Sequence, residues 1–107
     1  MYMRKEVQQG INKAVLLAID EYNASDEDIT DVKRLRSCSA SVGKKGKWYV
    51  LKSYSTIIAI IDTTTDTLFD FLRYVYGYTP TSVQHISKFD KDYGQGIWGC
   101  KYRVTYR

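Results

Sequence analysis

The sequence LRYVYGYTPTSVQHISKFDKDY, residues 72–93, places the end of one helix close to the start of another. Gly77 is the residue type that most readily ends a helix, and Pro80 prevents the same helix from continuing. We expect a first helix that begins near Thr63–Thr65 and a second that begins just after Pro80. Their apolar stripes are Leu68, Phe71, Leu72 and Val75, then Val83, Ile86 and Phe89. Two consecutive helices are therefore predicted in the second half of the chain.

An amphipathic helix is predicted over about residues 3–22. Its apolar residues recur at spacings of three and four, which is typical of a helix with one buried face. They are Val7, Ile11, Ala14, Val15, Ala18, Ile19 and Tyr22. Ser25 and Asp28 then have the spacing of a capping box for a short acidic turn. The acidic run 20–31 has the length of a calcium loop but lacks oxygen ligands where such a loop needs them, so no calcium site is predicted.

Three strands are predicted between residues 37 and 62. Residues 37–42 alternate serines with small or apolar residues, as a half-buried strand does. Gly43-Lys44-Lys45-Gly46 has the composition of a hairpin turn, and residues 47–53 and 56–62 are rich in β-branched and aromatic side chains. The run Ile57–Ile61 is apolar at every position. We therefore expect it at the centre of the sheet, covered on both faces or nearly so.

The C-terminal residues are predicted to form a fourth strand, because two sets of residues alternate there. The sets are Trp98, Cys100, Tyr102, Val104 and Tyr106 on one face, and Gly99, Lys101, Arg103, Thr105 and Arg107 on the other. The order of elements indicates one α+β domain over residues 1–107. We expect an N-terminal helix, a three-stranded antiparallel meander, two helices, and a C-terminal strand that completes a four-stranded antiparallel sheet. The helices should pack on one face of that sheet.

Length and apolar content limit the classes of protein that this chain can represent. A chain of 107 residues leaves little room for a catalytic cleft beside a second lobe. Its apolar runs are far shorter than the roughly 20 residues of a membrane span, and its start lacks a signal-peptide pattern. We expect a cytoplasmic protein that does not associate with membranes. In that compartment Cys38 and Cys100 should be free thiols.

The net charge of +4 conceals an uneven distribution. Residues 1–31 carry three basic and seven acidic side chains, a net −4, and the remaining residues carry thirteen basic and five acidic ones, a net +8. A basic body with an acidic N-terminal third can attract phosphate or an acidic partner on one side. Solubility alone also explains such a composition.

A basic and aromatic surface is the strongest candidate for a binding site. If the strands that carry these residues are neighbours, the cations converge and aromatic rings lie beside them for stacking. The candidate residues are Lys33, Arg34, Arg36, Lys44, Lys45, Lys47, Trp48, Tyr49, Lys101, Arg103 and Tyr106. The simpler alternative is that lysine and arginine only solvate an open sheet face.

Candidate catalytic groups are few. His85 could act as a general base for Cys38 or Cys100, but a dyad needs hydrogen-bond contact, of which a sequence gives no sign. A structural or exposed histidine is the simpler interpretation. One histidine and two distant cysteines do not complete a zinc site, and Gly94-Gln95-Gly96 lacks the third glycine of a dinucleotide fingerprint. We predict no enzymatic activity, no cofactor and no metal.

Two segments resemble a known group of proteins. They are YVLKSYSTIIA, residues 49–59, and YGYTPTSVQHISKF, residues 76–89. They resemble short accessory proteins of bacteriophages and integrative elements of Gram-positive bacteria, over roughly residues 47–93. The resemblance transfers no functional residue. It implies a genetic setting in which small proteins are often anti-defence factors, including anti-CRISPR inhibitors, or DNA-handling factors.

Two functions from different classes follow as expectations. The first is a non-enzymatic, stoichiometric inhibitor of a host defence effector, which would bind a CRISPR nuclease or its guide RNA. The second is a small accessory protein that binds single-stranded DNA or RNA through the basic body. Many anti-CRISPR inhibitors are acidic mimics of nucleic acid, and this basic chain departs from that pattern.

Overall fold

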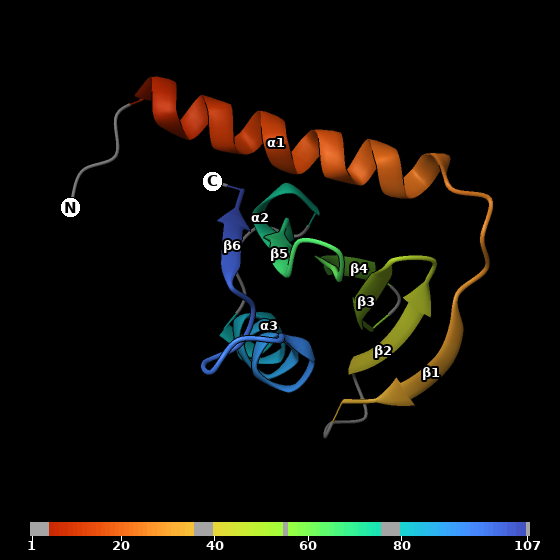
Figure 1. Cartoon of the computed structure of the whole chain (residues 1–107). Coiled ribbons are helices and arrows are strands. Elements are labelled where there is room, and N and C mark those ends of the chain that lie inside the picture. Colours follow the sequence, from red (N-terminus) through yellow and green to blue (C-terminus); the bar gives the residue numbers. More distant parts are fainter. Residues whose placement is uncertain (1–4, 36–39, 55, 76–79, 107) are drawn as a thin grey trace.

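Helices α1, Lys5–Ala24, and α3, Pro80–Tyr93, lie on opposite faces of one β-sheet (Figure 1). The structure is a computed structural model that describes residues 5–35, 40–54, 56–75 and 80–106. Both helices were expected from their apolar spacing, and Ile86 and Phe89 of α3 are fully buried as predicted. In the described part of the chain, no helix combines the length and the apolar character needed to span a membrane.

The sheet has six strands, in the spatial order in which they occur along the chain. The strands are β1 (Thr30–Arg34), β2 (Ala40–Lys45), β3 (Trp48–Ser53), β4 (Thr56–Asp62), β5 (Thr67–Asp70) and β6 (Tyr102–Thr105). Neighbouring strands are antiparallel except β5 and β6, which are parallel. The predicted four-stranded antiparallel sheet with a three-stranded meander is therefore wrong in the number of strands and in the direction of the last pair.

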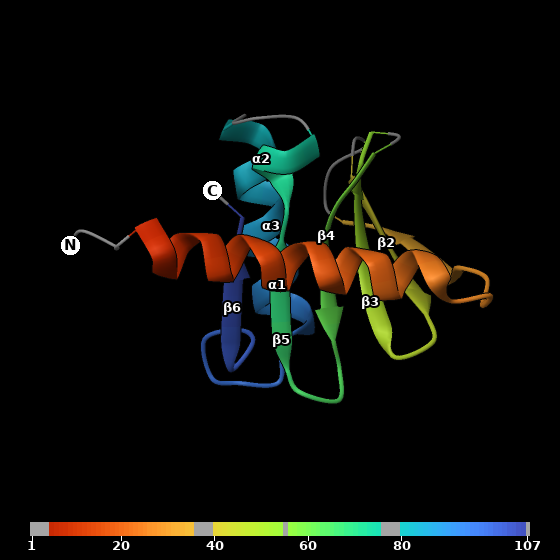
Figure 2. The same cartoon turned by 90° about the horizontal axis from the view of Figure 1, so that it is seen from above.

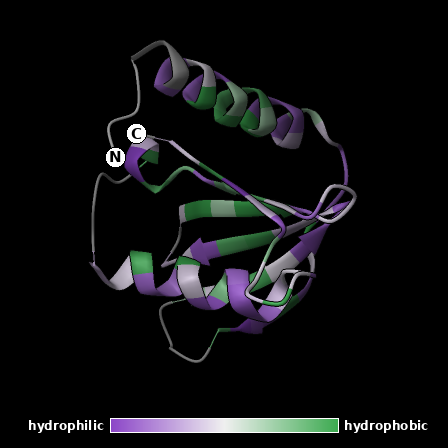
Figure 3. Ribbon diagram, turned by 60° about the vertical axis from the view of Figure 1, so that its left-hand side comes forward, coloured by the Kyte–Doolittle hydropathy of each residue, from purple (hydrophilic) through white to green (hydrophobic). Residues whose placement is uncertain are grey.

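Two hydrophobic clusters, one on each face of the sheet, hold the helices in place. On one face Val15 and Tyr22 of α1 pack with Val50 and Ile60. Figure 2 shows α1 crossing the strands of the sheet. On the other face the α3 residues Ile86 and Phe89 pack in a cluster with residues of β2–β5. Figure 3 shows the apolar residues of α1 turned toward the sheet. The expectation that all helices lie on one face is wrong, because strand β4 buries apolar side chains in both directions.

Residues 63–75 form a turn, a strand and a short helix instead of the single helix expected there. The carboxylate of Asp62 accepts hydrogen bonds from the backbone and the hydroxyl of Thr64, and Asp66 has a φ of 53°, so the chain reverses. Strand β5 then pairs with β4, and Asp70 accepts a hydrogen bond from the backbone of Leu72 at the start of α2, Leu72–Val75. The turn and the pairing with the central strand β4 are therefore favoured over the helix that the spacing of the apolar residues predicted.

The first hairpins also differ from the prediction. Strand β1 was not predicted, and strand β2 continues to Lys45, so the turn to β3 is the pair Gly46-Lys47 and not Gly43–Gly46. Gly46 has a φ of +57°, which suits a two-residue hairpin turn. Residues 37–39 of the predicted first strand lie outside the described residues. The result is an extra edge strand, β1, whose five residues are all exposed.

The predicted C-terminal strand is shorter than expected. The strand is confined to β6, where Val104 packs against the cluster beneath α1 but Tyr102, predicted on the same face, is 62% exposed. Cys100 packs against the cluster beneath α3, and Trp98 lies in a turn before the strand with 91% of its surface exposed. Trp98 and Cys100 therefore do not share a buried strand face with Val104.

Candidate functional site

The predicted basic residues occupy two opposite ends of the sheet. Strands β1 to β3 carry one group, β6 and the segment before it carry the other, and strands β4 and β5 separate them. The first group contains Lys33, Arg34, Lys44, Lys45, Lys47, Trp48 and Tyr49, and the second contains Lys101, Arg103 and Tyr106. Arg36 lies outside the described residues. The condition for one converging surface, that the strands be neighbours, is not met for the two groups.

Three of the predicted cations are engaged in contacts that hold the fold. Lys45 lies 4.1 Å above the ring of Tyr22 and donates a hydrogen bond to its carbonyl. Lys47 forms ion pairs with Glu21 at 2.7 Å and Asp62 at 3.5 Å, and the hydrogen bond that it donates to Glu21 is the main cause that raises its pKa. Arg103 lies 3.4 Å from Asp70. These contacts connect Lys45 to α1, Lys47 to α1 and β4, and Arg103 to β5.

Two predicted stacking residues pack in or against the core, Trp48 buried and Tyr106 half-buried. Trp48 is 6% exposed and meets the ring of Tyr22 edge to face, with centroids 5.7 Å apart. Tyr106 packs against the cluster beneath α1, and its ring lies 5.2 Å from that of Tyr74. Both rings contribute to the core on the α1 face. Tyr49, the third predicted aromatic residue, lines an open cleft.

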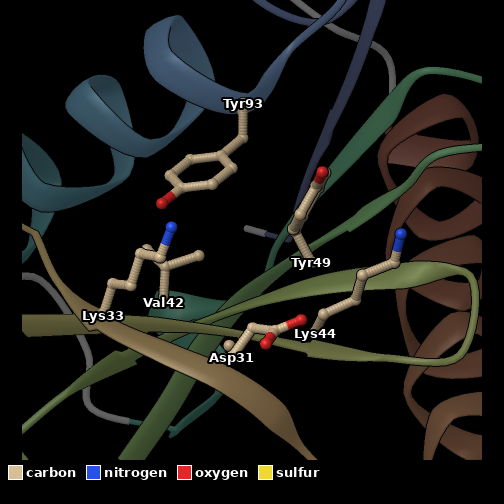
Figure 4. Close-up of a pocket in the computed structure, with 7 residues that line it drawn as sticks. Asp31, Lys33, Val42, Lys44, Tyr49 and Tyr93 are labelled. Atoms are coloured by element: carbon tan, nitrogen blue, oxygen red, sulfur yellow. The ribbon is translucent and has the colours of Figure 1, made fainter.

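This cleft, which we call the β1 cleft, lies on the α3 face at the β1 end of the sheet (Figure 4). It has a volume of about 300 Å³ and is lined by Asp31, Lys33, Val42, Gly43, Lys44, Tyr49 and Tyr93. Lys44 lies 5.3 Å from the centre of the Tyr49 ring, and the rings of Tyr49 and Tyr93 are 4.9 Å apart. The structure thus brings together three of the predicted binding residues.

The sequence prediction missed the two other residues of the β1 cleft that have polar side chains, Asp31 and Tyr93. Burial is the main cause that raises the pKa of Tyr93, with the charge of Asp92 adding to it, so its hydroxyl stays protonated at neutral pH. Among the described residues, the ion pairs involve none of Asp31, Lys33 and Lys44. The cleft therefore contains two cations, one carboxylate and two aromatic rings. Its three charged side chains form none of the ion pairs found among the described residues.

A second surface, the Ile97–Trp98 turn, was not predicted as a site. The turn is closed by a hydrogen bond of 2.7 Å from the backbone of Gly96 to the carbonyl of Gly99. Ile97 and Trp98 at its tip are 92% and 91% exposed, the highest exposures among the large apolar residues that the structure describes. The signal in the sequence is the motif Gly-Ile-Trp-Gly, in which two apolar residues stand between glycines instead of within a strand pattern.

Two buried or half-buried carboxylates hold the Ile97–Trp98 turn. Asp66 accepts hydrogen bonds of 2.9 Å from the backbones of both Gln95 and Lys101, and Asp90 accepts one of 2.7 Å from the backbone of Cys100. Burial by itself would raise the pKa of Asp66, but these backbone donors hold it below its usual value. The turn is therefore fixed on both sides by charge-assisted hydrogen bonds, which are stronger than neutral ones.

Two groups considered for catalysis, Cys100 and His85, lie in surroundings that shift their pKa values. Burial and the neighbouring carboxylate of Asp90 raise the pKa of the Cys100 thiol far above its usual value, so the nucleophilic thiolate is disfavoured. His85 is 7% exposed and lies 3.5 Å from the hydroxyl of Ser53, and burial lowers its pKa. Cys38 lies outside the described residues.

The geometry of the β1 cleft and of the Ile97–Trp98 turn is the basis on which a function can be inferred. Within the described ranges, no group of three or more histidine, cysteine or acidic residues is placed to hold a metal ion. Comparison of the chain with protein-family models, with curated proteins and with solved structures finds no match.

Proposed function

We propose that the protein is not an enzyme and acts by binding another protein stoichiometrically through the Ile97–Trp98 turn. The observation that carries the proposal is the nearly complete exposure of both side chains on a turn whose backbone is fixed. Tryptophan is among the residues most often found at the energetic centre of protein interfaces. A partner with an apolar pocket would bury both side chains.

The hydrogen bonds that fix the turn support a binding role for Ile97 and Trp98, as opposed to exposure without a function. A fixed turn loses little conformational entropy when a partner binds, so more of the burial energy appears as affinity. A turn that only connects α3 to β6 needs neither two large apolar residues at its tip nor two carboxylates beneath it. Asp66 and Asp90 fix the backbone on both sides of Ile97 and Trp98, so both side chains remain exposed to a partner.

The resemblance to accessory proteins of bacteriophages and integrative elements supports a host defence effector as the target. In this proposal the protein works in the bacterial cytoplasm as an inhibitor of the anti-CRISPR type, and it binds a CRISPR nuclease or its complex with guide RNA. A small protein with one protruding anchor suits inhibition by occupying a pocket, because it needs no turnover.

Cleavage of a DNA target by purified effectors, with and without excess protein, tests this function. We expect inhibition by the wild type and an about 30-fold weaker effect for Trp98→Ala, since loss of a central tryptophan costs about 2 kcal/mol. Tyr54→Ala removes another exposed aromatic ring, 69% exposed, at the turn between β3 and β4 and should inhibit like the wild type. Unchanged cleavage across effector types, or full inhibition by Trp98→Ala, would refute the proposal.

Binding of single-stranded nucleic acid is the second candidate function, and the β1 cleft favours it. Lys33, Lys44 and Tyr49 combine cations and an aromatic ring, as single-strand binding sites do. Affinity for a labelled single strand should then fall steeply as salt rises, because phosphate contacts release counterions. An affinity that does not change with salt would count against this function.

A further inference from the structure

We propose that the β1 cleft binds one nucleotide unit, with the phosphate on Lys33 and Lys44, the base on Tyr49, and an N–H or O–H donor of the nucleoside on Asp31. The proposal rests on the second function above and specifies its site. It is independent of the Ile97–Trp98 turn, which lies before β6 at the other end of the sheet. A nucleotide carries the three chemical groups that the cleft is equipped to recognise.

A β-bulge in strand β1 directs Asp31 into the cleft. Thr30 pairs with Lys44 and Lys33 with Val42, so three steps along β1 match two steps along β2. Asp31 takes up the extra residue with a φ of 53°, a left-handed conformation that aspartate tolerates better than most residues. The bulge thus places a carboxylate and the ammonium of Lys33 in one cleft, and such re-aimed side chains are frequent at functional sites.

The cations and the hydroxyl of the cleft suit a phosphate. Figure 4 shows the ammonium of Lys33 and the hydroxyl of Tyr93 pointing toward each other, with Lys44 on the far side of Tyr49. The hydroxyl of Tyr93 is protonated at neutral pH, as a tyrosine hydroxyl ordinarily is, and can donate a hydrogen bond to a phosphate oxygen. Lys33 and Lys44 take part in none of the ion pairs formed by the described residues, so a phosphate need not displace a carboxylate from either ammonium.

The Tyr49 ring suits an aromatic base. The ammonium of Lys44 lies over one face of this ring, 5.3 Å from its centre. A base can take this position once the ammonium moves to the phosphate, because stacking and cation–π contact use the same face of a ring. The side chain of Val42 lines the same cleft and adds an apolar contact for a base.

The carboxylate of Asp31 is the group that would make the cleft prefer a nucleotide over a simple anion. A site for phosphate alone has no use for a negative charge, which would repel the ligand. A nucleoside carries ribose hydroxyls and, in adenine, an exocyclic amino group, and each of these can donate a hydrogen bond to a carboxylate. The cleft volume of about 300 Å³ lies at the lower end of the range for small-molecule sites.

NMR titration of the labelled protein with AMP, adenosine, inorganic phosphate and an oligo(rA) decamer tests the proposal. We expect AMP and the decamer to shift the Tyr49 and Tyr93 signals, and phosphate and adenosine to bind at least tenfold more weakly than AMP. The double change Lys33→Glu/Lys44→Glu should weaken AMP binding at least tenfold. Lys13→Glu, an exposed lysine of α1 on the opposite face, should change it less than twofold. Asp31→Asn should lower the preference for AMP over phosphate at least threefold.

The outcomes separate this site from the broader function. If the decamer binds but the cleft variants weaken it no more than Lys13→Glu, single-strand binding stands and the β1 cleft proposal is overturned. If neither AMP nor the decamer binds, both are overturned. Phosphate that binds as tightly as AMP reduces the cleft to an anion site and also overturns the proposal. Thermal unfolding of each variant verifies that a loss of binding does not reflect a loss of folding.

Discussion

Asp31 and Asp66 have the same side chain and the same φ of 53°, yet they have opposite roles at the two ends of the sheet. Asp66 is 7% exposed and accepts hydrogen bonds from two backbone N–H groups that fix the Ile97–Trp98 turn. Asp31 is exposed on an edge strand and lines the β1 cleft. One carboxylate is committed to the fold, and the other is available to a ligand.

The comparison shows that local conformation does not decide the role of a charged residue. Both aspartates sit at places where the chain deviates from regular pairing, one in a turn and one in a bulge. Their difference comes from what surrounds them, because a carboxylate in a buried site must be hydrogen-bonded and an exposed one can remain hydrated. The turn is therefore a rigid surface, and the cleft is an adaptable one.

The same substitution at both positions should produce the largest contrast. Asparagine tolerates a positive φ as aspartate does, so the backbone conformation is retained. Asp66→Asn should lower the free energy of unfolding by about 3 kcal/mol, because one buried backbone donor loses its acceptor and the charge is removed. Asp31→Asn should change it by less than about 0.5 kcal/mol. Equal effects in urea denaturation would show that the two ends are held alike.

Glycine positions give a second, somewhat smaller contrast. A side-chain carbon at Gly94 would meet the backbones of Gly99 and Cys100, whereas one at Gly10 in helix α1 meets nothing within 4 Å. Gly94→Ala should therefore destabilise the protein by about 2 kcal/mol and loosen the turn. Gly10→Ala should stabilise it by about 0.5–1 kcal/mol, since alanine is the better helix former. Thermal unfolding of both variants measures the difference, and a neutral Gly94→Ala would mean that the turn is not rigid.

Acid should separate the contribution of the turn from that of the core. The pKa of His85 is lowered by burial, so the unfolded state takes up a proton first and stability falls as the pH drops below about 6.5. The pKa of Asp66 is also lowered, so its contribution is retained down to about pH 3.8 and is lost below it. Unfolding measured from pH 8 to 3 should show both steps. The change His85→Gln should remove the upper step only, and a profile that stays unchanged would contradict the assignment.

The two tryptophans should give the smallest effect on stability and a clear optical signal. Trp98→Phe should change the free energy of unfolding by less than about 0.5 kcal/mol, because the ring is 91% exposed. The remaining fluorescence comes from Trp48, which is 6% exposed, and should be blue-shifted and protected from acrylamide. In the wild type, a second, red-shifted component should be quenched readily. Protection of both tryptophans would show that the turn is covered in solution.

The sequence patterns correctly predicted the helices and strands whose burial in the structure matches their apolar spacing. Helices α1 and α3 and strands β3 and β4 follow from apolar spacing and from β-branched content. Residues 67–70 were misassigned because Leu68 and Phe71 suit a helix by spacing, while pairing with β4 made strand β5 the better arrangement. Strand β1 was missed because its five residues are exposed and carry no alternating apolar signal.

The candidate sites were predictable only in part, for the same reason. Lys33, Lys44 and Tyr49 were identified by composition, but Asp31 joins them through a bulge and Tyr93 through the packing of α3 on the sheet. Trp98 was assigned to a strand, and the hydrogen bonds that the backbones of Gln95 and Lys101 donate to distant Asp66 show why that segment is a turn. Contacts between residues about 30 positions apart are not encoded in local spacing.

The sequence by itself determined the α+β class, the central apolar strand, the two long helices and the basic character of the body, since these depend on periodicity and composition. Only the tertiary structure decided the parallel pairing of β6, the separation of the cations into two groups, and the contrasting roles of Asp31 and Asp66. Those features depend on which distant groups share a buried environment, because a buried polar group is stable only where its hydrogen-bond partners are also brought.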